Sequence, residues 1–201
     1  MGLRALKKDR TRQLLSDTAI AMFLADGFDQ VAVADIAAAA EVSKPTLFRY
    51  FASKEDLLLH RFADHQGELA RVVHDRAPGQ TPLEALHRHF TQGLQERDPV
   101  TGLCDHPNVL AFHRLVFDTP SVATRLVEYR TADADALAAE LGGAAGRLIA
   151  AQYVVVRQLL ARDNWAELAA GRTADEVYPE AVEAADLAFG LLTQGAARLG
   201  Y

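Results

Sequence analysis

The sequence predicts an all-α protein. Apolar side chains recur at three- and four-residue intervals along most of the 201 residues, which is the spacing of one helix face. Proline and glycine clusters interrupt these stretches, and no stretch shows the strict alternation of a half-buried strand. Half of the residues are hydrophobic, and alanine, the strongest helix former, is abundant. We therefore expect helices that each bury one face.

The first helix is expected over residues 8–25. Its apolar stripe consists of Leu15, Thr18, Ala19, Met22 and Phe23. Gly27 suits the end of this helix, because glycine adopts left-handed backbone angles without strain. Residues 1–8 are expected to form a loose basic arm, either disordered or reaching a DNA groove.

Residues 33–51 predict two short helices joined by a tight turn. The first, over residues 33–40, places on one face Val33, Ile36, Ala37 and Ala40. Glu41 and Val42 form the turn. Ser43 is expected to N-cap the second helix, and Pro45 falls in its first turn, where a missing N–H costs nothing. Leu47 and Phe51 lie four residues apart and are expected to face inward.

This arrangement is that of a helix-turn-helix, whose second helix fits the major groove of DNA. The side chains left facing outward suit a polyanion, since Lys44 and Arg49 are cationic and Thr46 and Tyr50 carry hydroxyls. An αα-corner in an ordinary helical bundle would have the same spacing, so the spacing alone leaves both interpretations open.

The residues around this motif resemble the N-terminal domain of the TetR/AcrR family of bacterial transcriptional regulators. The first part of the resemblance is carried by Arg12, Leu15, Thr18, Ala19, Met22, Phe23, Gly27 and Phe28. The second part is carried by Val33, Asp35, Ile36, Ala37, Ala40, Val42, Ser43, Thr46, Leu47, Phe48, Tyr50, Phe51, Ser53, Lys54, Glu55 and Leu57. The resemblance favours DNA binding over a plain helical corner.

The chain departs from the family pattern in three respects. Glu41 stands where the family has glycine, so the turn is not expected to need a positive φ. Val31 and Ala32 stand where a serine or threonine would cap the next helix. Phe48 replaces the usual tyrosine and lacks its hydroxyl. Fewer phosphate contacts than in a typical member are therefore expected.

The remaining chain predicts further helices. Ser53 resembles the first residue of a capping box, and the helix after it is expected to reach residue 73. Breaks rich in proline or glycine separate helices expected over residues 82–96, 108–117, 121–141, 144–162 and 174–199, with a loop over 163–175. Thr81 is expected to cap the first of these helices. We expect an N-terminal three-helix helix-turn-helix domain, residues 1–53, and a C-terminal helical bundle, residues 54–201, for dimerisation and ligand binding.

The resemblance implies a homodimer on a palindromic double-stranded DNA operator, and a small apolar or aromatic effector. One recognition helix reads too few base pairs to be specific, so such motifs usually work as pairs. Expected DNA-binding residues are Ser43, Lys44, Pro45, Thr46, Phe48, Arg49, Tyr50 and Lys54. Candidates for the ligand site are His89, Phe90, Phe112, His113, Phe117, Tyr153 and Trp165. Candidates for the dimer interface, on the last helix, are Val182, Ala185, Phe189, Leu192 and Ala196.

Charge supports this division of the chain. The net charge is −6, but residues 1–54 contain eight basic and six acidic residues, so the excess of acid lies in the remainder. No apolar stretch is long enough for a membrane span, and the single cysteine, Cys104, suits a reducing compartment such as the cytoplasm.

No metal, cofactor or catalytic residue is expected. Cys104 and His106 are close in sequence, but no oxyanion-hole pattern accompanies them. Two alternatives to a repressor released by a small molecule remain: a ligand-binding protein with a degenerate DNA-binding motif, and a helical enzyme that uses Cys104.

Overall fold

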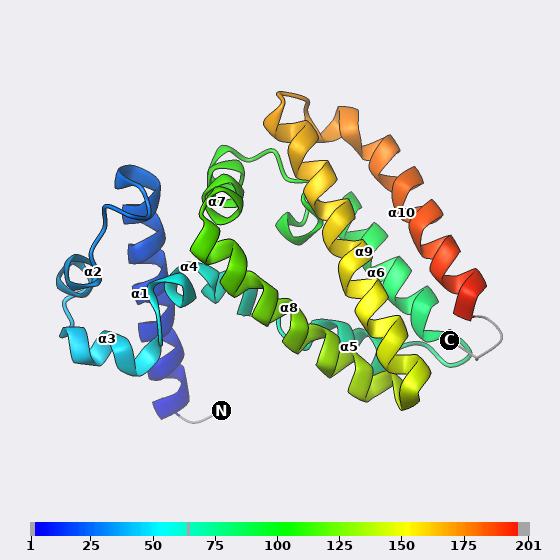
Figure 1. The fold of residues 1–201 in the computed structure, drawn as a ribbon, viewed down its shortest axis with the longest axis horizontal. Helices are drawn as coiled ribbons and strands as arrows, with labels where there is room; N and C mark the ends of the chain where they lie inside the picture. Colours follow the sequence, from blue (N-terminus) through cyan, green and yellow to red (C-terminus); the bar gives the residue numbers. More distant parts are fainter. Residues whose placement is uncertain (1–2, 64, 197–201) are drawn as a thin grey trace. The chain divides into compact units, whose positions relative to one another are not determined.

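The computed structural model describes residues 3–63 and 65–196. Over these residues the chain forms ten α-helices and one 3₁₀-helix, and no strand (Figure 1). The all-α prediction is confirmed. The chain divides into two compact units: unit 1 holds the described residues up to His65 together with Ala111–Glu128, and unit 2 holds Gln66–Leu110 and the described residues from Tyr129 onward. The predicted boundary at residue 53 separates the part that binds DNA from the part that binds the ligand and forms the dimer. It therefore stays a prediction.

Unit 1 is built on four consecutive helices, which are α1 (Leu3–Asp26), α2 (Val33–Ala39), α3 (Lys44–Tyr50) and α4 (Lys54–Ala63). Their shared core contains Leu15, Phe23, Ile36, Leu47 and Leu57. The loose arm expected over residues 1–8 is wrong for residues 3–8, which form the first turns of α1; residues 1 and 2 lie outside the described residues.

The helix predicted to run from Ser53 to residue 73 is instead two helices. α4 ends at Ala63, and α5 (Glu68–His74) begins after Gly67, whose φ of 70° is incompatible with a continuing helix. The apolar spacing continues across the break, so periodicity alone did not reveal it. The glycine was the only local signal of a stop.

Unit 2 contains α5, α6 (Pro82–Gln95), α9 (Gly143–Ala169) and α10 (Ala174–Ala196). α10 packs against both α6 and α9, and Figure 1 shows the three lying side by side. Thr81 and Glu84 form a complete capping box at the start of α6, so the predicted cap is confirmed. Leu86, Leu94, Tyr153 and Phe189 are among the fully buried side chains of its core.

The intervening elements are a 3₁₀-helix, η1 (Pro99–Thr101), and the helices α7 (Pro107–Asp118) and α8 (Pro120–Leu141). The bounds of α7 and α8 agree with prediction to within one residue, whereas η1 was not predicted. The predicted end of α9 at residue 162 is wrong, because α9 continues to Ala169, and the loop predicted over 163–175 is limited to residues 170–173. Asn164 explains part of this, since its buried amide donates to the Thr101 carbonyl at 2.9 Å and keeps the helix against η1. The prediction for α10 beyond Ala196 lies outside the described residues.

Among the described residues, none of the helices combines the length and the apolar character that a membrane crossing needs.

Candidate nucleic-acid interface

The turn between α2 and α3 is a Schellman motif. The amide of Val42 donates to the carbonyl of Ala37 at 2.9 Å, and the amide of Glu41 donates to that of Ala38 at 3.0 Å. These bonds place Glu41 in the left-handed region, with φ of 55°. The expectation that a glutamate here avoids a positive φ is wrong, because the geometry of the helix end sets this angle whichever side chain occupies it.

The start of α3 is fixed by Ser43. Its Oγ accepts the Thr46 amide at 3.2 Å and lies 2.8 Å from the Thr46 hydroxyl, and Pro45 occupies the first turn. The predicted cap is confirmed. At α2, by contrast, Ala32 provides no side-chain cap, as the sequence indicated.

The two faces of α3 differ sharply in exposure. Leu47 is fully buried and Phe51, directly after the helix, is nearly so, which anchors α3 in the core of unit 1. Thr46 and Tyr50 are half-buried, while the exposed side chains are Lys44, Pro45, Phe48 and Arg49. Phe48 is 44 % exposed, so it does not pack between the helices of the motif.

The exposed face of α3 is cationic and aromatic. The Lys44 ammonium lies 5.9 Å from the centroid of the Phe48 ring, and the Arg49 guanidinium lies 5.7 Å from that of Tyr50. Within the part of the chain that the structure describes, neither cation forms an ion pair with a carboxylate. Both charges are therefore available to an anionic partner.

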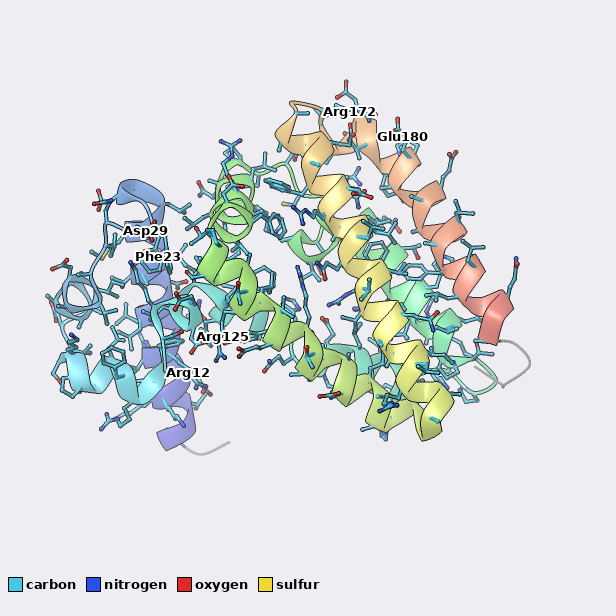
Figure 2. The ribbon with its side chains drawn as sticks, viewed as in Figure 1. Arg12, Phe23, Asp29, Arg125, Arg172 and Glu180 are labelled. Atoms are coloured by element: carbon cyan, nitrogen blue, oxygen red, sulfur yellow. The ribbon has the colours of Figure 1, made fainter. Side chains whose placement is uncertain are left out.

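Arg12 of α1 supports the far end of α3, a role that the sequence analysis did not assign. Its Nη2 donates to the Tyr50 carbonyl at 3.3 Å, and its guanidinium lies 5.8 Å from the Phe51 ring centroid (Figure 2). A cation near the last carbonyls of a helix is stabilising. Only the contact across 38 residues identifies this arginine, because sequence spacing contains no signal for it.

Lys54 is held inside unit 1. Its ammonium donates to the Phe28 carbonyl and lies 4.4 Å from the centroid of the Phe28 ring and 5.4 Å from that of Phe23. The two phenyl rings are themselves in contact, with centroids 4.9 Å apart. Lys54 therefore braces the segment between α1 and α2, and a phosphate contact by this side chain stays a prediction.

The start of α4 is tied to α8. Ser53 Oγ accepts the Asp56 amide at 3.1 Å, as predicted, but the Asp56 carboxylate turns away and accepts Arg125 Nε at 2.8 Å (Figure 2 labels Arg125). The Asp56 side chain is only 6 % exposed. Arg125 also pairs with Glu128, and these residues line a cleft of about 370 Å³ within unit 1.

Three of the ligand-site candidates lie on α7 within unit 1. His113 contacts the rings of Phe112 and Phe117, with centroid distances of 6.1 and 5.8 Å, and Phe62 stacks on Phe112 at 5.9 Å. His113 is 7 % exposed, and its Nδ1 has no hydrogen-bond partner among the described residues. Burial lowers the pKa of His113 to about 4, so its imidazole is neutral at pH 7.

The other four candidates belong to unit 2. Phe90 and Tyr153 pack against Phe189, with centroids 5.5 and 5.2 Å apart, and the Tyr153 hydroxyl donates to the Leu86 carbonyl at 3.1 Å. Burial raises the pKa of Tyr153 well above its usual value. His89 lies 3.7 Å from a Glu68 carboxylate oxygen, and Trp165 is half-buried. The candidates are thus divided between the units, and a ligand role for them stays a prediction.

The residues predicted for the dimer interface face the protomer's own core. Ala185, Phe189 and Ala196 are buried there, and Val182 and Leu192 pack against the same cluster. Most of their surface is therefore occupied within the protomer, and a role for them in a dimer stays a prediction. The exposed apolar side chains of the last two helices are Leu148, Val155 and Leu159 on α9 and Leu187 and Leu191 on α10.

Asp105 and His106, which follow Cys104, accept backbone amides at the starts of two helices. Asp105 accepts the Ala174 amide at the beginning of α10, at 2.9 Å, and His106 Nδ1 accepts the Asn108 amide at the beginning of α7, at 3.3 Å. These are capping contacts, which explain this acidic and basic pair without a catalytic role.

Comparison with known proteins adds independent information about the N-terminal helices. The family model for bacterial regulatory proteins of the tetR family matches residues 15–60, which include α2, α3 and most of α4. The transcriptional regulator TcmR of Streptomyces glaucescens is 35 % identical over 152 residues, which are 75 % of this chain and 64 % of TcmR. The transcriptional repressor LfrR of Mycolicibacterium smegmatis is 33 % identical over 106 residues, 52 % of this chain and 54 % of LfrR. The chain thus spans less than two thirds of either relative.

Solved structures share the fold over nearly the whole chain. NalD, the secondary repressor of the MexAB-OprM multidrug efflux pump in Pseudomonas aeruginosa, matches with a TM-score of 0.60 at 13 % identity, covering 90 % of this chain and 97 % of NalD. SmeT in its complex with triclosan matches with a TM-score of 0.59 at 16 % identity, covering 92 % of this chain and 91 % of SmeT. At these identities the likeness concerns the fold.

Proposed function

The chain belongs to the TetR family of bacterial regulatory proteins, and on this premise we propose that it is a sequence-specific DNA-binding transcriptional regulator, a repressor released by a small molecule. In this proposal residues 1–53 read DNA, and residues 54–201 bind the effector and form the dimer. The protein would act in the cytoplasm, where its DNA partner lies.

The observation that carries the proposal is the exposed face of α3. Lys44 and Arg49 have no carboxylate partner among the described residues, while Leu47 on the opposite face is fully buried. An anchored helix with unpaired cations on its outer face has the charge and the width that the major groove accepts.

Each exposed residue of α3 has a proposed role. Lys44, Pro45 and Arg49 would reach base edges, and Phe48 would lie against the sugar-phosphate surface. Ser43, Thr46 and Tyr50 would hold the phosphate backbone. Lys54 would contribute to affinity by bracing the segment before α2, because its ammonium is engaged by the Phe28 carbonyl.

We propose that a second copy of the chain covers the apolar face of α9 and α10. Val155 and Leu159 are four residues apart, as are Leu187 and Leu191, so each pair lies on one side of its helix. The two helices pack against each other, and an apolar surface of this kind on neighbouring helices is typical of a symmetric interface. The family resemblance also places the dimer bundle on the last two long helices.

The small-molecule effector is proposed from the family resemblance, and SmeT, a structural neighbour, has been solved with triclosan.

The two alternatives are less well supported. A degenerate motif is disfavoured by the capped and exposed α3, and an enzyme based on Cys104 by the capping roles of Asp105 and His106.

The decisive experiment measures DNA binding by fluorescence anisotropy. The probes are a duplex from the region upstream of the protein's own gene and a scrambled duplex of equal length, each at several salt concentrations. We expect Arg49→Ala to cost about 1–3 kcal/mol on the first duplex and to reduce the preference between the two.

The matched control is Arg88→Ala, which removes an exposed arginine of α6 and should leave both affinities unchanged. Equal weakening of both duplexes by Arg49→Ala would exclude base reading by this residue. If the unaltered protein binds neither duplex in a salt-dependent manner, the proposed function is wrong.

A further inference from the structure

The first turns of α1 concentrate positive charge. Residues 6–12 contain four basic residues, Lys7, Lys8, Arg10 and Arg12, which are half of the eight in residues 1–54, and one acidic residue, Asp9. Lys7, Lys8 and Arg10 are exposed, and Arg12 is half-buried. None of the four basic side chains forms an ion pair with a carboxylate of the described residues. Four such cations attract a polyanion to this end of the helix.

Two of these cations continue the inward face of α1. Leu15 and Ala19 are fully buried and define the face that packs on the rest of unit 1. A helix turns by about 100° for each residue, so Lys8 and Arg12 lie along the same line, whereas Arg10 lies on nearly the opposite side. The face that is apolar over the core therefore becomes cationic in the first turns of the helix.

This cationic face begins where α3 ends. Arg12 Nη2 donates to the Tyr50 carbonyl at 3.3 Å, and the Arg49 guanidinium lies 5.7 Å from the centroid of the Tyr50 ring. Lys8 comes one turn before Arg12, and Figure 1 shows that the first turns of α1 continue past the end of α3. Tyr50 thus connects the cations of α3 with those of α1 within unit 1.

The side chains on this face suit phosphate groups. Arginine donates two N–H groups to a phosphate in a bidentate manner, and lysine attracts it as a point charge. The Tyr50 carbonyl is the only hydrogen-bond acceptor of the Arg12 guanidinium among the described residues, which leaves donors for a second partner. Because these residues belong to a helix, their backbone is already ordered, and binding costs less conformational entropy than it would for a flexible arm.

We propose that Lys8 and Arg12 bind phosphates of the DNA backbone beside the base pairs that α3 reads. This inference rests on the proposed function, because the partner is the same DNA. It extends the DNA-binding surface beyond α3 and gives α1 a task of its own. α3 supplies the preference for a sequence, and α1 supplies affinity that is independent of sequence, since phosphate contacts carry no information about the bases.

The test compares Lys8→Gln with Arg10→Gln in anisotropy titrations of the full chain on the upstream and the scrambled duplex. Both changes remove one positive charge from the same part of α1, and lysine, arginine and glutamine have similar helix propensities. Lys8→Gln should weaken binding to both duplexes about tenfold and lower the slope of log K against log salt concentration by about 2, one phosphate for each subunit of a dimer. Arg10→Gln, on the opposite side of the helix, should leave the slope unchanged.

The ratio of the two affinities separates phosphate binding from an effect on α3. Lys8→Gln should leave this ratio unchanged, and Lys8→Arg, which keeps the charge, should bind like the unaltered protein. A lowered ratio would mean that Lys8 orients α3, and equal effects of Lys8→Gln and Arg10→Gln would mean that only the overall charge matters; either result would overturn the inference. The proposed function would still stand if Arg49→Ala reduced the ratio. A protein that bound neither duplex would refute both.

Discussion

At the scale of single residues, the fold holds Glu41 at a backbone angle, and His113 in a buried neutral state, that each residue disfavours in the unfolded chain. Glu41 has a φ of 55°, which an L-amino acid adopts at a cost of about 1–2 kcal/mol. His113 is neutral and buried between aromatic rings. Each state is imposed by the surrounding structure, and each can be tested by a single substitution.

Glu41→Gly should stabilise the protein by about 0.5–1 kcal/mol. Glycine relieves the left-handed strain, and the greater freedom of glycine in the unfolded chain offsets part of the gain. Urea unfolding measures this difference. Glu41→Ala serves as the control, since it removes the charge but retains the strain and should give little gain. A destabilised Glu41→Gly protein would mean that the carboxylate matters more than the backbone angle.

The stability of the protein should fall as the pH drops from 7 to 5, in part through His113. Its pKa is about 4 when folded and about 6.5 when unfolded, so in this range the unfolded chain binds more protons. The loss from this one group is about 2 kcal/mol at pH 5. Urea unfolding at both pH values, repeated on His113→Phe, measures it. The variant should lose less stability than the unaltered protein, and an equal loss would contradict the assignment.

At the scale of elements, the ion pair between Asp56 and Arg125 connects the start of α4 to α8 within unit 1. Ser53 caps α4, and the Asp56 carboxylate contacts Arg125, which lies 69 residues away in sequence. A nearly buried carboxylate depends on such a partner, because its desolvation is otherwise uncompensated.

Arg125→Met should destabilise the protein by about 1–3 kcal/mol, since it leaves Asp56 buried without its guanidinium partner. The neighbouring change Glu128→Gln is the control, because that side chain is mostly exposed and exposed ion pairs contribute little. Thermal unfolding of both variants provides the comparison. If the two were equally stable, the pair with Asp56 would not contribute to the fold.

At the scale of the whole molecule, the two apolar faces of α10 differ in exposure. Ala185 and Phe189 face the core of their own protomer, whereas Leu187 and Leu191 are exposed. Burying such leucines against a second copy contributes about 1.5–3 kcal/mol for each side chain. A helix-turn-helix protein also needs two copies to read half-sites one helical turn, about 34 Å, apart.

The double variant Leu187→Glu and Leu191→Glu should therefore be a folded monomer with weakened affinity for operator DNA. Sedimentation velocity measures the association state, and circular dichroism checks the fold. Leu14→Glu is the matched control: it alters an exposed leucine of α1 in the same way and should leave the association state unchanged. A double variant that sediments like the unaltered protein would place the interface elsewhere.

Local patterns in the sequence were sufficient for much of the fold. The Ser43 cap, the Thr81 cap and most helix bounds follow from interactions between residues three or four apart in the sequence. The same holds for the buried Leu47 and the exposed Arg49 on α3. The positive φ of Glu41 did not follow, since a helix end can impose this angle on a residue other than glycine.

The sequence by itself thus determined the helices, the helix-turn-helix and the outward face of α3. Only the tertiary structure decided that Lys54 is held by Phe28, that Arg12 supports α3, and that Leu187 rather than Phe189 is exposed on α10. The physical reason is the distance along the chain over which the deciding interactions act. A helix is encoded by neighbours along the chain, but which of its apolar stripes is buried depends on side chains that lie dozens of residues away.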